Sequence, residues 1–342
     1  MKSNKRLTAP LFSIVGIYLC VLLAGFLAPY NFATQDRNLL YAAPSRLHFV
    51  DTDGRWHLRP SVCVLTERLG AFGVYDEDRN NCFPIHFFVR GSTYRFLGVF
   101  QSTWHFFGVE SPARIFLLGS DGYGRDVFSR LLYGGQISLF SGLLAMGLSL
   151  LVGALLGTVA GYYGGWIDGA VMRCSELFLA LPWLYLLFAI RAFLPLHISP
   201  SRTFLLLIAV IGLIGWARPA RLIRGVVLSG KERGYVLAAR GFGGLDFYLM
   251  RRHLLPQTYS VLLTQAALLI PQYILAEVTL SFLGLGVGEP VPSWGNMLST
   301  LQQYDVLISY WWMWAPGLAL IPVFLIYQLL GSALQASADC NA

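Results

Sequence analysis

Charged residues are scarce in this chain of 342 amino acids: Asp, Glu, Lys and Arg make up 13% of it, whereas 56% of the residues are hydrophobic. A soluble domain carries roughly a quarter charged residues. The deficit and the long uncharged runs exclude a soluble protein and predict an integral membrane protein. The net charge of +7 does not predict nucleic-acid binding, because the basic residues flank apolar segments, as the positive-inside rule requires.

Motifs for metal and nucleotide chemistry are also missing. No C-x-x-C spacing occurs among the five cysteines, the six histidines are scattered, and neither H-E-x-x-H nor G-x-S-x-G is present. We therefore expect no metal site and no catalytic centre. Gly225–Lys231 matches most of a phosphate-binding P-loop, but Glu232 takes the place of the Ser or Thr that would bind Mg²⁺. A carboxylate there would repel phosphate, so we expect no ATP to bind this chain.

Six apolar stretches suggest membrane spans, since a helix needs about 20 apolar residues to cross the hydrocarbon core. The predicted spans lie within residues 11–30, 135–162, 169–193, 204–217, 260–284 and 307–330. An even number of spans puts both termini on one side, and the basic residues before the first span make that side the cytoplasm. We expect the first span to be an uncleaved anchor, because a signal peptide usually has a shorter apolar core.

The segment between the first two spans differs in composition. Residues 31–130 contain eleven Arg, ten acidic residues and no Lys, and the topology places them outside. Alternating apolar residues around Asp53-Gly54 and around Gly91 predict two hairpins, so we expect a small β-rich extracytoplasmic insert over residues 31–109. Cys63 and Cys82 are predicted to form a disulfide there, as an oxidising compartment allows; two unpaired thiols are the alternative.

The most informative segment is a polar interruption from Arg218 to Pro256. It contains eight Lys or Arg and two acidic residues, and the pair Gly243-Gly244 divides it. Helix-forming residues on both sides of this pair predict a helix, a tight turn and a second helix. Because short loops rich in Lys and Arg stay inside, the segment is predicted to be cytoplasmic.

Three stretches resemble the dipeptide/oligopeptide/nickel-type permeases of bacterial ABC importers. Leu117–Leu139 is similar to their GTD-x-x-GRDV-x-SRL-x-YG signature. The polar segment is similar to their cytoplasmic EAA loop, with the patterns YVEAAR and RHILP at Tyr235–Arg240 and Arg252–Pro256. Ala276–Leu298 is similar to SFLGLG-x-x-x-P-x-PSWG-x-ML. Leu237 replaces the glutamate of the EAA pattern.

The resemblance implies an all-α fold with six transmembrane helices, of the type I ABC importer class. It implies a second homologous permease, two ATPase subunits that carry ATP and Mg²⁺, and an extracytoplasmic solute-binding protein, assembled in the lipid of a bacterial inner membrane. The chain would form half of the path for peptides or similar small solutes, and would not be an enzyme. The residues that would couple it to the ATPase are Tyr235, Ala238, Ala239, Arg240, Gly243, Leu255 and Pro256.

The predicted organisation has three parts. Residues 1–30 hold the cytoplasmic N-terminus and the first anchor, and residues 31–130 hold the extracytoplasmic insert and the signature segment. Residues 131–342 form a five-helix permease core with the coupling loop at 218–256. The signature residues are Asp121, Gly124, Arg125 and Asp126. We expect them to form an ion-pair and turn cluster at the outer end of a helix. Contact with the substrate is the alternative.

Two carboxylates fall inside apolar stretches, where a charge is costly and must find a partner or water. Glu277 is the better candidate for the translocation path or a helix interface. Glu176 is a weaker one, because it could instead pair with Arg173. Gly153, Gly157 and Gly161 form overlapping GxxxG units, which predict close helix packing, and Trp294 is predicted to lie at the membrane interface.

Two other classes of function are left open by the sequence alone. A secondary transporter would need no ATPase, and would usually show related halves with paired broken helices; no such repeat is visible. A membrane-anchored enzyme or sensor would place its chemistry in the insert, where no catalytic constellation is recognisable.

Overall fold

The computed structural model describes residues 2–50, 56–68, 73–96, 100–193 and 199–339. Its contacts divide the chain into two compact units. The first unit consists of Met1–Ile14, Leu139–Leu280 and Pro322–Ala342, and the second of Val15–Ser138 and Ser281–Ile321. Every strand in the described part of the chain belongs to the second unit.

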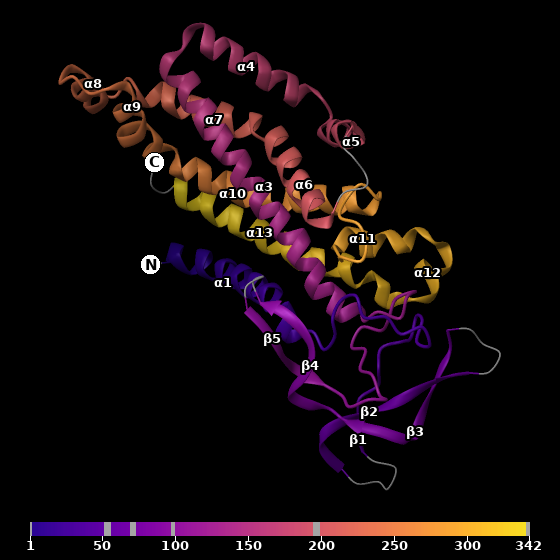
Figure 1. Cartoon of the computed structure of the whole chain (residues 1–342). Helices are drawn as coiled ribbons and strands as arrows, with labels where there is room; N and C mark the ends of the chain where they lie inside the picture. Colours follow the sequence, from indigo (N-terminus) through magenta and orange to yellow (C-terminus); the bar gives the residue numbers. More distant parts are fainter. Residues whose placement is uncertain (1, 51–55, 69–72, 97–99, 194–198, 340–342) are drawn as a thin grey trace. The chain divides into compact units, whose positions relative to one another are not determined.

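Helices dominate because an apolar chain in lipid must satisfy its backbone hydrogen bonds internally. In chain order the α-helices are α1 (Lys2–Leu22), α2 (Ala24–Leu27), α3 (Val127–Tyr163), α4 (Gly165–Ala180), α5 (Trp183–Phe193), α6 (Pro200–Gly215), α7 (Ala217–Gly230), α8 (Gly234–Gly241), α9 (Asp246–Leu249), α10 (Tyr259–Phe282), α11 (Trp294–Ser299), α12 (Tyr304–Ser309) and α13 (Ala315–Asp339) (Figure 1). Shorter turns of π or 3₁₀ type are η1 (Met250–Leu254), η2 (Leu255–Thr258), η3 (Thr300–Gln302) and η4 (Trp311–Trp314).

Several of these helices are suited to cross a membrane. Among the described residues, three are long and apolar enough: Val127–Tyr163, Asp246–Phe282 and Trp311–Ala336. The number rises to five if each of two bent pairs, α4 with α5 and α6 with α7, forms one span. Thr8–Leu22 in α1 is a shorter apolar helix. The chain therefore has the helices of a multi-pass membrane protein, and six spans stay a prediction.

Two predicted spans have different bounds in the structure. The predicted span over 169–193 is not one straight helix, because the chain bends by 93° between α4 and α5. Pro182 explains the break: proline disfavours helical backbone at the residue before it, and Leu181 is extended, with ψ 137°. The last predicted span began too early, since α12 and η4 precede the long helix α13.

The glycines of α3 bring it close to α7 within the first unit. A Cβ on Gly157 would lie 2.5 Å from the carbonyl oxygen of Ala220, and one on Gly153 would lie 2.8 Å from the Pro219 side chain. Any larger residue would push the helices apart, so the packing predicted from the GxxxG pattern is confirmed.

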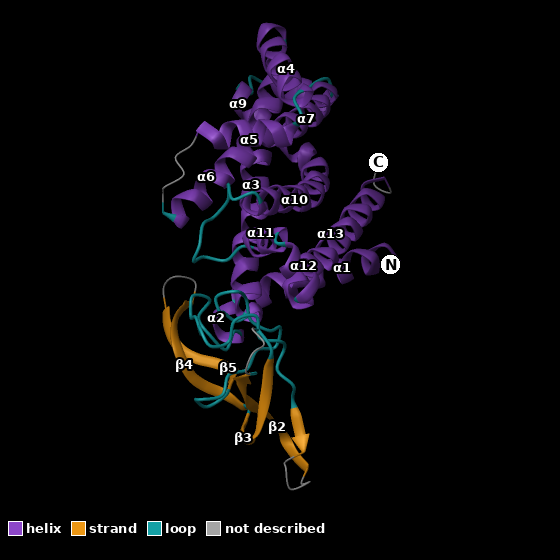
Figure 2. Cartoon of the chain, turned by 90° about the vertical axis from the view of Figure 1, so that its right-hand side faces the viewer, coloured by secondary structure: helices purple, strands orange, loops and turns teal. Residues whose placement is uncertain are grey.

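The strands of the second unit form two sheets, drawn in orange in Figure 2. The antiparallel three-stranded sheet has the order β1 (His48–Val50), β2 (Trp56–Glu67) and β3 (Tyr75–Pro84). The antiparallel two-stranded sheet pairs β4 (His86–Phe96) with β5 (Phe100–Gly108). Cys63 on β2 lies opposite Cys82 on β3, and the two form a disulfide with the Sγ atoms 1.96 Å apart. All five strands fall within residues 31–109.

The structure tests only one of the two predicted hairpins. The turn at Asp53-Gly54 lies outside the described residues. A turn at Gly91 is wrong, because Gly91 lies inside β4. A Cβ on Gly91 would lie only 2.8 Å from the ring of His105 on β5. This buried imidazole is held between the carbonyl oxygens of Ala28 and Ser92, so the glycine makes room for a side chain and not for a turn.

Candidate functional site

The polar segment of the first unit forms a helix, a tight turn and a second helical stretch. At the end of α8, Phe242 N donates to Ala238 O and Gly244 N donates to Ala239 O, both at 3.0 Å. Gly243 has φ +84°, in the left-handed region that closes helices and favours glycine. α9, η1 and η2 then lead into α10. The helix-turn-helix predicted from the sequence is confirmed.

Buried apolar side chains fix this segment to α7. Val236 of α8 and Leu254 of η1 are almost fully buried, and they pack with Ile223 and Val227 of α7 in one cluster. The burial of several such side chains stabilises the arrangement by about 1.5–3 kcal/mol for each. The inner face of the segment is therefore held in a defined position.

Polar contacts tie the same segment to the end of α3. Lys231 Nζ donates to the carbonyl oxygen of Gly161 at 3.1 Å, and the Tyr162 hydroxyl donates to the carboxylate of Asp246. The last carbonyls of a helix have no partner inside it and favour a cation, so Lys231 acts as a cap for α3. A displacement of α8 and α9 would consequently reach α3 and α7.

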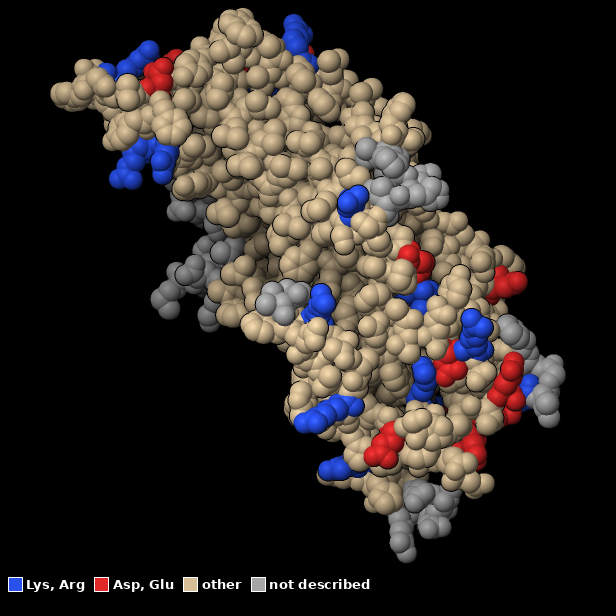
Figure 3. Space-filling view, viewed as in Figure 1, with Lys and Arg blue, Asp and Glu red and all other residues tan. Residues whose placement is uncertain are grey.

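The outer face of the segment exposes large apolar side chains. Phe242 is 93% exposed, Leu245 76% and Phe247 69%; we call these three residues the apolar patch. Figure 3 shows Lys and Arg gathered over this α8–α9 end, and a wide uncharged surface over the helices of the first unit. An exposed apolar patch with a charged surround marks a surface that contacts another protein or the membrane.

The predicted coupling residues lie on α8, in the turn that follows it and in η2. Five of the seven are exposed: Tyr235, Ala238, Arg240, Gly243 and Pro256. Ala239 and Leu255 are half-buried. The sequence analysis missed the apolar patch itself, although a signal was present: large apolar residues flank a glycine turn, where small or polar residues are usual.

A second candidate site, in the second unit, gathers four charged side chains. Arg125 Nε donates to Asp121 Oδ2 at 2.7 Å, and its Nη1 donates to Glu289 Oε2 at 2.6 Å. Arg130 Nη2 donates to Glu289 Oε1 at 2.9 Å. Both arginines and Asp121 are almost completely buried, so each charge depends on its partners. Glu289 was missed by the sequence analysis, because 164 residues separate it from Arg125.

The start of α3 completes this charged cluster. Asp126 Oδ2 accepts hydrogen bonds from Ser129 N and Ser129 Oγ, at 2.8 and 2.6 Å, and so caps the helix. Burial raises the pKa of Asp126 to about 7. Gly124 has φ +68°, and a Cβ on it would lie 1.8 Å from the Asp36 carbonyl oxygen. Glycine is therefore the residue that this turn accepts.

Trp294, which the sequence predicts at the membrane interface, is buried within the chain. Its side chain is only 4% exposed, and its Nε1 donates to the Leu131 carbonyl oxygen at 2.9 Å. Ser293 and Asn296 form a reciprocal capping box at the start of α11, directly before and after this residue.

The two intramembrane candidates also differ. Arg173 Nη1 donates to Glu176 Oε2 at 3.0 Å in an exposed pair, and such pairs contribute little to stability. Glu277 is completely buried in α10. In the part of the chain that the structure describes, no group of three or more His, Cys, Asp or Glu is placed to hold a metal.

Comparison with known proteins supplies the family. A match to the family described as "Binding-protein-dependent transport system inner membrane component" covers residues 153–338. The dipeptide transport system permease protein DppC of Bacillus subtilis is 36% identical over 229 residues, 67% of this chain and 69% of the relative. The glutathione transport system permease protein GsiD of Pectobacterium atrosepticum is 34% identical over 230 residues, 67% and 74% of the two chains.

Among solved structures, a chain of the inward-facing MetNI methionine ABC transporter aligns with a TM-score of 0.42 and 19% identity, covering 60% of this chain and 93% of its own. The family match spans more than half of the present chain, from the middle of α3 to α13. The chain therefore belongs to the binding-protein-dependent transport system inner membrane components, a family of transport permeases and not of enzymes.

Proposed function

We propose that this chain is the transmembrane permease subunit of an ABC importer for peptides or similar small solutes, and that it forms half of the translocation path. Family membership supports a transport role, and the names of the dipeptide and glutathione permeases that it resembles support this class of cargo. The multi-pass helices support a location in the bacterial inner membrane. The fold would be the type I importer fold, with six spans and both termini in the cytoplasm.

The apolar patch on the α8–α9 segment carries this proposal. We infer that a separate ATPase subunit covers it, because a partner must remove such a surface from water. Leu237, half exposed next to the patch, would then meet an apolar groove on the ATPase. Two ATPase subunits would supply ATP and Mg²⁺, and a second homologous permease and an extracytoplasmic solute-binding protein would complete the importer.

ATP hydrolysis would be coupled to transport through the contacts of the α8–α9 segment with α7 and α3. Closure of the ATPase subunits around ATP would move α8 and α9, and the packing on α7 and the Lys231 contact to α3 would carry that movement into the helix bundle. Nucleotide can drive this change only by binding the two states of the importer with different affinity. Glu277 is proposed to line the path or a helix interface.

Affinity purification of the tagged chain from its native membrane tests the proposal. We expect a second permease and P-loop ATPases to co-purify. Gly243→Pro should abolish ATPase recovery, because proline fixes φ near −65° where the native φ is +84°. Ala239→Arg should do the same. Gly241→Ala is the matched control, since a Cβ there meets open space. Recovery of this chain without any ATPase, also after crosslinking, would favour a secondary transporter and overturn the proposal.

A further inference from the structure

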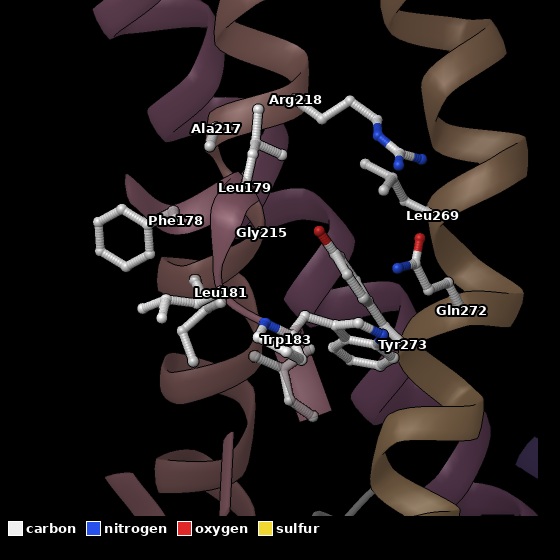
Figure 4. Close-up of a pocket in the computed structure, with 13 residues that line it drawn as sticks. Phe178, Leu179, Leu181, Trp183, Gly215, Ala217, Arg218, Leu269, Gln272 and Tyr273 are labelled. Carbon is white, nitrogen blue, oxygen red and sulfur yellow. The ribbon is translucent and has the colours of Figure 1, made fainter. Parts of the chain in front are cut away.

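A cavity of about 300 Å³ lies inside the first unit, where two helix breaks come together. One break is at Leu181-Pro182 between α4 and α5, and the other is at Trp216 between α6 and α7. α10 forms the opposite wall with Leu269, Gln272 and Tyr273 (Figure 4). Broken helices expose backbone and polar side chains inside a membrane protein, which is where solute sites of transporters form.

The walls are mostly apolar, with few polar groups. Phe178, Leu179 and Trp183 line one side. The Tyr273 hydroxyl is already engaged, since it lies 2.9 Å from Ser149 Oγ. Figure 4 shows the guanidinium of Arg218 directed across the cavity toward α10, on which Gln272 also faces the cavity.

Arg218 differs from the two arginines of these helices that have a carboxylate partner. Arg224 makes two hydrogen bonds to Asp168, and Arg173 pairs with Glu176. Within the described residues, no carboxylate or other acceptor bonds to Arg218 or to Gln272. Arg218 is exposed on the amphipathic helix α7, just after the break at Trp216, and its side chain lines the cavity. The cavity therefore presents five guanidinium N–H donors and a side-chain amide at its surface.

We propose that this cavity binds the carboxylate of the cargo during its passage. A guanidinium takes a carboxylate through two parallel charge-assisted hydrogen bonds, and the Gln272 amide can donate another. The apolar walls would take the side chain next to that carboxylate. The volume is at the low end for ligand sites, which suits one end of a short peptide. This inference rests on the proposed function and adds a chemical requirement to it, namely a free carboxylate.

A lipid phosphate has the same charge and could also bind a guanidinium. Gln272 is near the middle of α10 (Tyr259–Phe282), however, and headgroups lie about 15 Å from the centre of a hydrocarbon core that is about 30 Å thick. The position favours cargo over lipid. The two ligands can be separated by experiment.

Equilibrium binding to the complete purified importer in nanodiscs, without its solute-binding protein, tests the inference. The probe is one labelled dipeptide, as the free acid and as the C-terminal amide. We expect the wild type to bind the acid about tenfold more tightly, the effect of one lost charge-assisted contact. Arg218→Gln should remove that difference. Arg221→Gln, an exposed arginine of α7 outside the cavity, should keep it.

Other outcomes are also decisive. Equal binding of acid and amide, or binding of neither, overturns the inference, as does an Arg218→Gln variant that still prefers the acid. Loss of a co-purifying anionic lipid from Arg218→Gln, with equal peptide binding, would assign the cavity to lipid. Gln272→Leu, with a smaller expected loss, replaces Arg218→Gln if that variant does not assemble. If the proposed function itself were wrong, ATPase subunits would be absent from the wild-type preparation, and this result is distinct from any result of the peptide-binding measurement.

Discussion

The apolar patch and the charged cluster around Arg125 break the usual distribution of residues in opposite ways. The patch exposes Phe242, Leu245 and Phe247, whereas the cluster buries Asp121 and Arg125. Buried charges must find their partners within the chain, as these do through Glu289 and Arg130. Exposed apolar side chains gain nothing from the chain and need a partner from outside. The cluster therefore maintains the fold, and under the proposed function the patch would serve assembly.

Arg125→Ala should have the largest effect on stability. It would leave the buried Asp121 with only the longer ion pair to Arg130, at 3.6 Å, and breaking a buried pair costs about 3–5 kcal/mol. We expect a large drop in the thermal unfolding temperature of the purified protein and little folded protein in the membrane. Arg68→Ala is the control, because the Arg68–Asp76 pair is more than half exposed and exposed pairs contribute little. An equal loss in both variants would contradict the comparison.

Gly157→Leu tests whether the close packing of α3 on α7, which supports the patch segment, is required. Its side chain would collide with the Ala220 backbone, and overpacking of this kind costs about 1–3 kcal/mol. We expect a lower unfolding temperature and weaker coupling of ATP hydrolysis to transport. Gly147→Leu on the same helix is the control, because a Cβ there meets nothing within 4 Å. Full coupling in Gly157→Leu would show that α3 and α7 can separate without consequence.

Asp126 gives the cluster a pH dependence. Its folded pKa of about 7 lies above the usual 3.8, so between these values the folded state binds more protons than the unfolded state. Stability should therefore fall as pH rises from about 4 to about 7, and level off above that. Unfolding temperatures measured over this range should show the decline in the wild type. Asp126→Asn should reduce it, and an unchanged slope in that variant would assign the dependence to another group.

Leu237→Glu should have the smallest effect. It restores the residue type of the EAA pattern, but places a charge beside the apolar patch, where a carboxylate would have to lose water on docking. We expect ATPase binding to weaken by about fivefold, which corresponds to roughly 1 kcal/mol. Titration of the ATPase subunits against the reconstituted permease measures this, with Leu237→Met as the control. Tighter binding of the Glu variant would mean that the partner surface is basic.

Local patterns in the sequence predicted the elements that depend on local physics. The turn at Gly243 and the α3–α7 packing followed from glycine spacing. Patterns failed where distant residues decide the outcome. Gly91 resembled a turn, but it accommodates His105 on the neighbouring strand. The burial of Trp294, whose Nε1 donates to the Leu131 carbonyl oxygen, was also not predicted. Glu289 and the cavity around Arg218 require contacts between segments that the sequence does not place together.

The most direct test of the account is the amount of ATPase that co-purifies with the chain when the apolar patch becomes polar. We predict that Phe242→Asp with Leu245→Asp abolishes ATPase recovery while the chain stays folded in the membrane, because neither side chain is buried in the fold. Trp166→Asp, at an 82% exposed position of α4, should retain it. Undiminished ATPase recovery with the doubly substituted patch would contradict the claim that this surface couples the permease to ATP hydrolysis.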